Sequence, residues 1–310
     1  MNSIATLTMN PAIDKSVSVE SVIPEKKLRC TFPRQDPGGG GLNVARAIHK
    51  LGGDSLALYV AGDLSGKLLQ RLLDSESVRN RAIEVAGPTR EDLHVYVQST
   101  GQQYRFNMPG SPLIESEWRS VLDALSALNP FPAYLVASGS LPSGVPDDFY
   151  AQVVKIGRKH GSRVIVDASG QPLILAAKEG AWFLKPNFAE LAQLAGCEIE
   201  DELHVRTGAL KLIEQGNCEA VCVSLAAAGV ILVTQEETTR ISAPTVKAVS
   251  KVGAGDSMVA GTTLALSRGT CLVEAVRYGV AAGSAAVMRP GTQLCNKEDT
   301  ERLYKIMCSR

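Results

Sequence analysis

Short apolar runs alternate with longer segments of helical periodicity along most of the chain. Runs rich in β-branched side chains predict strands at residues 4–8, 134–137, 163–167, 182–184, 220–224 and 229–234. Apolar residues repeated every three or four positions predict helices at residues 43–51, 65–73, 115–128, 147–159, 202–215, 255–267, 272–288 and 297–307. Strands and helices in succession predict an α/β fold, with a mostly parallel sheet between layers of helices.

Two stretches in the first third of the chain do not fit this alternation. Residues 17–31 are short and β-like, and residues 93–98 alternate strictly between apolar and polar side chains. After a turn at Thr100 and Gly101, residues 103–107 complete the pattern of a hairpin. We therefore expect a small antiparallel sheet, formed by residues from about 14–33 and 88–108, that stands off the main body as a lid over a ligand site.

Composition narrows the class of protein. The chain has 310 residues, is 45% hydrophobic, and carries 32 basic and 32 acidic side chains. This is the composition of a globular protein, and the balanced charge argues against a nucleic-acid partner. The sequence contains no apolar run of membrane-spanning length and no signal-peptide pattern. The seven cysteines lack the spacing of a zinc site or a disulfide framework, so we expect reduced thiols, most of them in the core of a cytoplasmic protein without a membrane partner.

The segment 251–258 carries the clearest chemical signal. Small residues precede a predicted helix, so the backbone N–H groups of Gly253, Ala254, Gly255 and Asp256 can face outward together. Such donors, with the helix dipole, bind an anion that carries developing negative charge. The carboxylate of Asp256 can accept the proton of an attacking hydroxyl. The alternative interpretation is a tight turn followed by an ordinary acid in the first turn of a helix.

A second signal is the run of glycines at residues 38–41, which leads into a predicted helix. It indicates the close approach of a ligand or of another backbone, with a flexible turn as the alternative. A dinucleotide fingerprint does not fit, because Val44 stands where the last glycine should be and residues 30–36 form a poor preceding strand. A Walker loop does not fit residues 62–68, which are one residue short and place Leu68 where Ser or Thr is needed.

A third signal follows the predicted strand at residues 182–184. Asn187 and Glu190 have the spacing of a capping box, in which each side chain bonds the other residue's backbone N–H. At the carboxyl end of a strand the same groups can also orient magnesium-bound water and nucleotide phosphates. The two roles are compatible.

Segments 37–47 and 251–261 resemble the two signatures of the PfkB (ribokinase-like) carbohydrate kinases. The resemblance extends through residues 6–14, 138–142 and 185–187, and residues 24–31, 89–95 and 103–110 are most similar to the branch formed by the bacterial type II 6-phosphofructokinases. It implies one kinase domain over residues 1–310, a three-layer αβα sandwich with a small β-sheet lid. It also implies ATP-dependent phosphorylation of fructose 6-phosphate at its 1-hydroxyl in glycolysis, with Mg²⁺ and K⁺, by a homodimer joined through the lids.

The resemblance further implies a role for each residue around the sugar. Asp256 would be the base, and the backbone of Gly253, Ala254 and Gly255 would stabilise the transferred phosphoryl group. The sugar hydroxyls would be held by Asp14, Gly39, Gly40, Asn43 and Ser140. The sugar phosphate would be held by Arg90 and Arg105, with Lys27 and Arg29 of the partner subunit, because a phosphate needs compensating cations. The alternative for these four basic residues is a solvated face of the lid.

For ATP the resemblance implies contacts from Lys185, Asn187, Ser224, Gly229 and Ser284, with Glu190 acting on Mg²⁺ through water. Potassium would bind oxygens of Ser250, Val252, Ala286 and Gly291. One position departs from the family, because Ala226 stands where a glycine usually precedes the turn at Gly229. A glycine-like φ there would strain the loop that touches the nucleotide. His94, in the predicted hairpin, is expected on a strand surface, with contact to the sugar as the alternative.

Three alternative functions stay open. A related kinase could act on tagatose 6-phosphate or fructose 1-phosphate, because residues 8–14 suit those enzymes as well. A non-catalytic sensor of sugar phosphates is disfavoured by the presence of Asp256 together with all of its neighbouring small residues. An NAD-linked oxidoreductase is disfavoured by the incomplete dinucleotide fingerprint.

Overall fold

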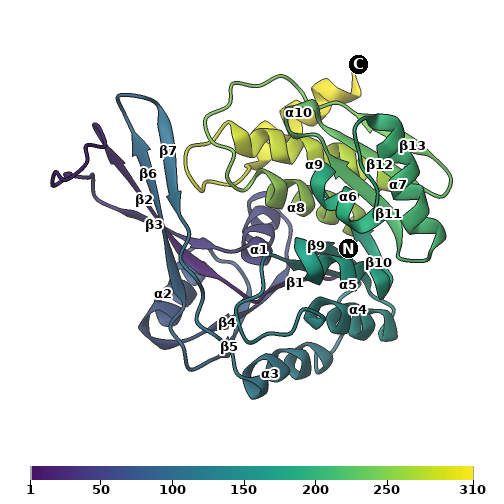
Figure 1. Ribbon diagram of the computed structural model, residues 1–310, viewed down its shortest axis with the longest axis horizontal. Helices are drawn as coiled ribbons and strands as arrows, with labels where there is room; N and C mark the ends of the chain where they lie inside the picture. Colours follow the sequence, from purple (N-terminus) through teal and green to yellow (C-terminus); the bar gives the residue numbers. More distant parts are fainter. Residues whose placement is uncertain (1, 310) are drawn as a thin grey trace.

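The computed structural model describes residues 2–309 and contains two sheets of different size (Figure 1). The large sheet has the strand order β13-β12-β11-β10-β9-β8-β1-β4-β5. Its strands are β1 (Ile4–Thr8), β4 (Leu56–Ala61), β5 (Asn80–Glu84), β8 (Tyr134–Ser138), β9 (Arg163–Asp167), β10 (Ala181–Leu184), β11 (Cys218–Ser224), β12 (Val230–Thr234) and β13 (Thr238–Ile241). Every pairing from β5 to β11 is parallel, and the two pairings beyond β11 are antiparallel. The predicted α/β class is confirmed.

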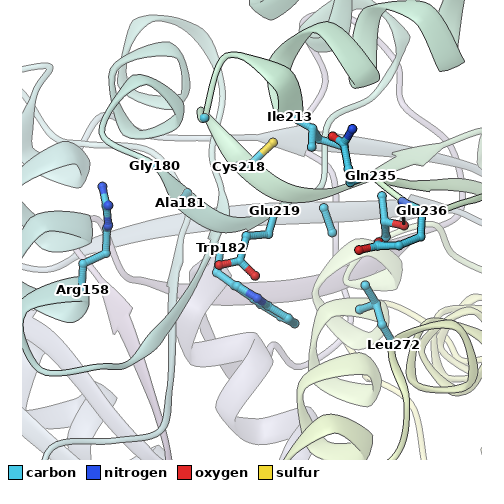
Figure 2. Close-up of a pocket in the computed structure, with 13 residues that line it drawn as sticks. Arg158, Gly180, Ala181, Trp182, Ile213, Cys218, Glu219, Gln235, Glu236 and Leu272 are labelled. Atoms are coloured by element: carbon cyan, nitrogen blue, oxygen red, sulfur yellow. Dashed lines mark hydrogen bonds between the residues drawn. The ribbon is translucent and has the colours of Figure 1, made fainter.

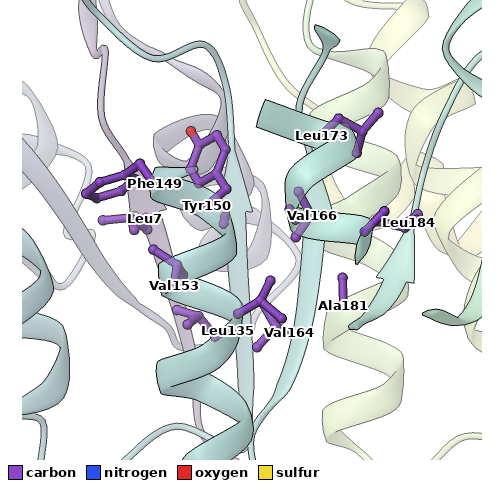
Figure 3. Packing of buried hydrophobic residues seen from close by; sticks show 14 of the residues in the cluster. Leu7, Leu135, Phe149, Tyr150, Val153, Val164, Val166, Leu173, Ala181 and Leu184 are labelled. Atoms are coloured by element: carbon purple, nitrogen blue, oxygen red, sulfur yellow. The ribbon is translucent and has the colours of Figure 1, made fainter. Parts of the chain in front are cut away.

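Helices cover both faces of the large sheet, because its central strands carry apolar side chains on both faces. One face packs against α3 (Glu115–Ser126), α4 (Phe149–Lys159), α5 (Gly170–Lys178), α6 (Phe188–Ala195) and α7 (Glu202–Glu214). Figure 3 shows part of this core, where Phe149 and Val153 of α4 lie against Leu7 and Leu135. The opposite face packs against α1 (Gly40–Lys50), α2 (Asp63–Ser75), α8 (Ala254–Ser267), α9 (Leu272–Val287) and α10 (Lys297–Cys308).

The small sheet consists of β2 (Ala12–Val19), β3 (Arg34–Gly38), β6 (Arg90–Val97) and β7 (Gln102–Phe106), in the order β3-β2-β6-β7. It stands apart from the helical layers in Figure 1. The predicted hairpin is confirmed, since β6 and β7 pair antiparallel with Leu93 opposite Phe106. The sheet is nevertheless mixed and not wholly antiparallel, because β2 and β6 pair in parallel. These two strands follow β1 and β5, which run in the same direction in the large sheet, so both enter the small sheet from the same side.

Several predicted boundaries are wrong. Residues 20–33 form no strand. The antiparallel partner of β2 is β3, which lies beyond the range 14–33 and overlaps residues 30–36, the segment judged a poor strand. β3 has the sequence Arg-Gln-Asp-Pro-Gly and so lacks an apolar run, and Arg34 Nη2 donates to Asp36 Oδ1 within the strand at 2.8 Å. The pattern also does not predict β4, β5, β13, α5 or α6.

The seven cysteines are all free, as expected, but only three of them are buried, namely Cys218, Cys222 and Cys295. The other four are exposed, so the prediction that most cysteines belong to the core is wrong. Within residues 2–309, no helix is both long enough and apolar enough to cross a membrane.

Candidate active site

Several of the predicted site residues lie at the carboxyl edge of the large sheet. The parallel strands β1, β8, β9, β10 and β11 end together at this edge, where open α/β sheets bind their ligands. Asp167 is the last residue of β9, and Lys185 directly follows β10. Their side chains form an ion pair, with Lys185 Nζ 3.1 Å from Asp167 Oδ1. Burial opposes the charge on Lys185, but the carboxylate of Asp167 outweighs it and raises the pKa of the ammonium group.

Helix α8 begins at this edge with an exposed set of backbone donors. Gly253 caps the helix with a φ of 72°, and a Cβ atom there would lie 2.5 Å from Leu294 Cδ2. Only glycine fits this position without strain. The N–H groups of the first turn have no partner within the helix, and Ser257 N is the donor that reaches Gly253 O, at 2.8 Å. The residues expected to surround a phosphoryl group therefore do form a helix N-terminus.

Asp256 lies in this first turn and is held by a neighbour from α1. Asn43 Nδ2 donates a hydrogen bond of 2.9 Å to Asp256 Oδ2. Burial, and then the nearby Asp167 carboxylate, raise the pKa of Asp256 to about 6, while the Asn43 bond and Lys185 act in the opposite direction. The group is thus mostly ionised at neutral pH, yet its pKa is close enough to 7 for efficient proton transfer.

The glycine segment is closely packed, because neighbouring groups lie directly against it. A Cβ atom at Gly38 would lie 2.5 Å from Asp14 Oδ1, and one at Gly40 would lie 2.3 Å from Ser138 Oγ. Gly39 has a φ of 110° and caps α1. The prediction of close approach is confirmed, and the alternative of a flexible turn is excluded.

Asp14 and His94 meet on the inner face of the small sheet, which is the face toward α1 and α8. Asp14 is buried, and its Oδ1 lies 3.8 Å from His94 Nε2. His94 is only 5% exposed, so its expected place on a strand surface is wrong. Asp14 pairs with Asp92 and Ser16 pairs with His94, so Asp14 and His94 point to the same face of the small sheet. The sequence of β6 alone does not show that this face is the inner one. Ser140 lies at the same edge and accepts a 3.0 Å bond from Asn10 Nδ2.

Of the four basic residues expected around a sugar phosphate, the structure places Arg90 and Arg105 on the inner face of the small sheet and leaves Lys27 and Arg29 apart from it. Arg90 is paired with Asp92, at 2.8 Å, and also donates to the backbone oxygen of Asn10. Arg105 is exposed on β7, opposite His94. Both Lys27 and Arg29 are exposed on segment 20–33.

Four of the residues expected around the nucleotide lie at or just beyond the carboxyl ends of β10 and β11, and the fifth, Ser284, lies on α9. Asn187 and Ser224 are paired in an isolated bridge, and Ser224 N donates to Pro186 O at 2.9 Å. The predicted capping box is confirmed, since Asn187 N reaches Glu190 Oε2 and Glu190 N reaches Asn187 Oδ1, each at 2.9 Å. Ser284 sits on α9, where its hydroxyl donates to Val280 O.

The departure at Ala226 has a visible consequence. Ala226 has a φ of 51°, in the left-handed region that favours glycine. Three residues later, Gly229 has a φ of 99°, and a Cβ atom there would lie 2.1 Å from Ile241 O. The loop beside the nucleotide residues therefore has two positions with positive φ. Glycine occupies the second, Gly229, whereas the first is the strained Ala226.

Two of the residues expected around potassium, Ser250 and Gly291, bring their oxygen atoms together. Ser250 is buried and donates through Oγ to Gly291 O at 2.9 Å, while Val252 N donates to Ser250 Oγ. Ala286, on α9, immediately precedes Val287, whose carbonyl accepts the Ser250 N–H. Hydroxyl and carbonyl oxygens suit a hard cation, so these residues fit potassium. Among residues 2–309, no cluster of three or more His, Cys, Asp or Glu could hold a metal ion.

A hollow of about 430 Å³ lies at the opposite edge of the large sheet (Figure 2). Ala181 and Cys218, the first residues of β10 and β11, line it together with Trp182 and Glu219. None of the predicted site residues lines this hollow.

Sequence patterns missed two members of the site itself. Asp167 ends a predicted strand, so its place at the carboxyl edge was a signal that could have been used. Arg46, on α1, donates to Asn43 Oδ1, and nothing in the sequence pattern distinguishes it from a surface arginine. The site is thus a helix start with free amides, a carboxylate with a pKa near 6 and a partly buried lysine–aspartate pair.

This combination defines an enzyme that transfers phosphoryl groups to a small molecule. Comparisons with known proteins agree with this class of enzyme. The chain matches the model of the pfkB family carbohydrate kinases over residues 4–299, and it belongs to this family.

The ATP-dependent 6-phosphofructokinase isozyme 2 of Mycobacterium tuberculosis is 45% identical over 303 residues, which cover 98% of this chain and 89% of that protein. Two crystal structures of phosphofructokinase-2 from Escherichia coli are also similar over 100% of both chains. The complex with potassium has a TM-score of 0.94 at 42% identity, and the complex with fructose 6-phosphate has a TM-score of 0.93 at 41% identity.

Proposed function

We propose that this protein is an ATP-dependent 6-phosphofructokinase, which converts fructose 6-phosphate to fructose 1,6-bisphosphate in cytoplasmic glycolysis. The observation that carries the proposal is the position of Asp256, beside the free amides of α8 and bonded to Asn43. The similarity to phosphofructokinases over the whole length of the chain supports the choice of sugar phosphate. The proposal takes residues 1–310 as one kinase domain.

In the proposed reaction, Asp256 accepts the proton of the 1-hydroxyl as that oxygen attacks the γ-phosphorus of ATP. The backbone N–H groups at Gly253, Ala254 and Gly255 bind the transferred group and offset its negative charge. Lys185 lies near the same place, since a Cβ atom on Gly255 would be 3.6 Å from its Nζ. Asp14 and Asn43, with Gly39, Gly40 and Ser140, hold the hydroxyls of the sugar.

Two cations complete the proposed site. Glu190 fits Mg²⁺ through a water molecule. Its Oε2 accepts a hydrogen bond from Asn187 N, which holds the carboxylate at the start of α6. Mg²⁺ bound there neutralises charge on the nucleotide phosphates. Potassium would bind the oxygens of Ser250, Val252, Ala286 and Gly291, behind the start of α8. The potassium complex of the similar Escherichia coli protein supports this assignment.

We assign the small sheet the role of a lid. A cavity of about 700 Å³ separates its inner face from the loops 247–250 and 290–293. Ser16, Asp36 and His94 line the cavity from the sheet side. Movement of the sheet toward these loops would exclude water and limit the hydrolysis of ATP.

We further propose that two chains form a homodimer through the outer faces of their lids. Tyr104 and Phe106 of β7 are 46% and 49% exposed, and their partners across the strands are Val95 and Leu93. An exposed apolar face of this kind is typical of a protein interface. The dimer would bring Lys27 and Arg29 of the partner subunit to the sugar phosphate, which needs them because Arg90 is already paired with Asp92.

Replacing Phe106 by glutamate should convert the dimer to a monomer, because a charge would be buried in the interface. Sedimentation equilibrium without nucleotide should give the mass of one chain for this variant and of two chains for the wild type. Leu203→Glu is the matched control, since Leu203 is an exposed leucine on α7, outside the lid. The dimer proposal is wrong if F106E and wild type have the same mass.

A coupled assay of ADP release tests the proposed activity. With ATP and Mg²⁺ present, the kcat/KM for fructose 6-phosphate should exceed those for tagatose 6-phosphate and fructose 1-phosphate by at least about tenfold, the factor that one well-placed contact supplies. If the enzyme prefers another of these sugars, it belongs to a different branch of the family. ADP release with none of them would leave the sensor as the better hypothesis.

A further inference from the structure

Arg46 carries a guanidinium group that is completely removed from solvent, with a side-chain exposure of 0%. Its Nε and Nη2 donate to the two carboxylate oxygens of Glu76, at 2.8 and 2.6 Å. Its Nη2 also lies 3.7 Å from Asp36 Oδ1 at the base of the lid. A buried charge is retained only when it is fully paired, and here the pairing ties α1 to the end of α2 and to β3.

The remaining nitrogen of this guanidinium points toward the catalytic corner. Nη1 donates to Pro37 O at 2.6 Å and to Asn43 Oδ1 at 3.3 Å. The other end of the Asn43 amide, Nδ2, donates to Asp256 Oδ2 at 2.9 Å. Asn43 therefore lies between a guanidinium that only donates hydrogen bonds and a carboxylate that only accepts them.

This arrangement permits one orientation of the amide. If the Asn43 amide turned by 180°, its oxygen would face the Asp256 carboxylate and its NH₂ group would face the guanidinium. Both contacts would then be repulsive. Without Arg46, the penalty for the second orientation would come from Asp256 alone.

We propose that Arg46 is a positioning residue, which orients the Asn43 amide so that its NH₂ group always faces Asp256. This proposal depends on the proposed function at one point, because it takes Asp256 to be the base. Arg46 itself touches neither the reacting atoms nor the substrate, and it acts through Asn43.

The expected consequence concerns the acid limb of the pH profile. Four groups face Asp256 from four elements, namely Asn43 of α1, Asp14 of β2, Asp167 of β9 and Lys185 after β10. Asn43 and Lys185 stabilise the carboxylate, whereas burial and the two aspartates raise its pKa to about 6. Because the base works as a carboxylate, weakening the Asn43 bond raises this pKa and moves the acid limb to higher pH.

The test compares two variants that differ only at Arg46. Glu76→Gln alone keeps the guanidinium beside Asn43, while Arg46→Met combined with Glu76→Gln removes the guanidinium without leaving Glu76 unpaired. In the double variant the acid limb of kcat/KM should move up by about one pH unit, giving about a fivefold loss at pH 6 and little loss at pH 8. Glu76→Gln should keep the wild-type limb, although its melting temperature should fall.

A double variant that is folded and keeps the wild-type acid limb would overturn the proposal, and would leave Arg46 a purely structural role. If the double variant does not fold, neutron diffraction on wild-type crystals decides the question by locating the deuterium atoms of the Asn43 amide. They are expected on the atom that faces Asp256, and their presence on the atom that faces Arg46 would overturn the proposal. A wild type that releases no ADP with any phosphosugar would instead count against the proposed function.

Discussion

Replacing Asp256 by asparagine should lower kcat with fructose 6-phosphate by about 10²- to 10⁴-fold, the contribution of a general base. The asparagine keeps the shape of the side chain, and its oxygen can still accept the bond from Asn43 Nδ2. It cannot accept the proton of the attacking hydroxyl. Sugar binding, measured by calorimetry, should stay nearly unchanged, while ADP release should almost disappear.

The matched control for this experiment is Asp201→Asn. Asp201 caps α7 through a side-chain bond to His204 N, and asparagine caps a helix equally well. This control should keep the wild-type kcat. Unchanged turnover in D256N would show that another group is the base.

Gly253→Ala should have the second largest effect. A φ of 72° is unfavourable for alanine, and the new Cβ would lie 2.5 Å from Leu294 Cδ2. The start of α8 must then shift, and its amides no longer point at the transferred group. Loss of one such donor typically reduces kcat by about 10²- to 10³-fold, which the ADP-release assay would detect.

Gly269, just past the other end of α8, provides the control for backbone strain. Its φ is 88°, and no atom lies within 4 Å of the position that a Cβ would take. Gly269→Ala should therefore lower the melting temperature through strain alone and keep kcat within about twofold of wild type. Equal losses of kcat in both variants would mean that strain, and not the position of the amides, explains the effect.

The parts of the site that could be predicted from sequence are those encoded over short distances. Small residues before an apolar helix predict the start of α8, and the spacing of Asn187 and Glu190 predicts their capping box. The glycines of segment 38–41 predict close packing because few other causes require four of them in succession. Each of these signals lies within a dozen residues.

The remaining parts depend on contacts between distant elements. Arg46 and Glu76 meet because α1 and α2 pack on the same face of the large sheet, and Asp167 meets Lys185 because β9 and β10 are neighbours. The parallel pairing of β2 with β6 likewise follows from where β1 and β5 leave the large sheet.

Edge elements were missed for a related reason. In β5 only Ile83 is buried, and β13 buries only Ile241, so neither strand shows a continuous apolar run. α6 has eight residues, which is too short for a clear helical period. β4 is a continuous, mostly buried apolar run of six residues, which periodicity alone does not distinguish from a buried segment of helix.

The most direct test is a crystal structure with fructose 6-phosphate and a non-hydrolysable ATP analogue. We expect the 1-hydroxyl within hydrogen-bond distance of an Asp256 carboxylate oxygen, at about 2.6–3.2 Å. The γ-phosphate should lie against the amides of Gly253, Ala254 and Gly255, in line with that hydroxyl. A sugar whose hydroxyls all lie beyond the reach of Asp256, or a γ-phosphate bound elsewhere than at the start of α8, would contradict the proposed site.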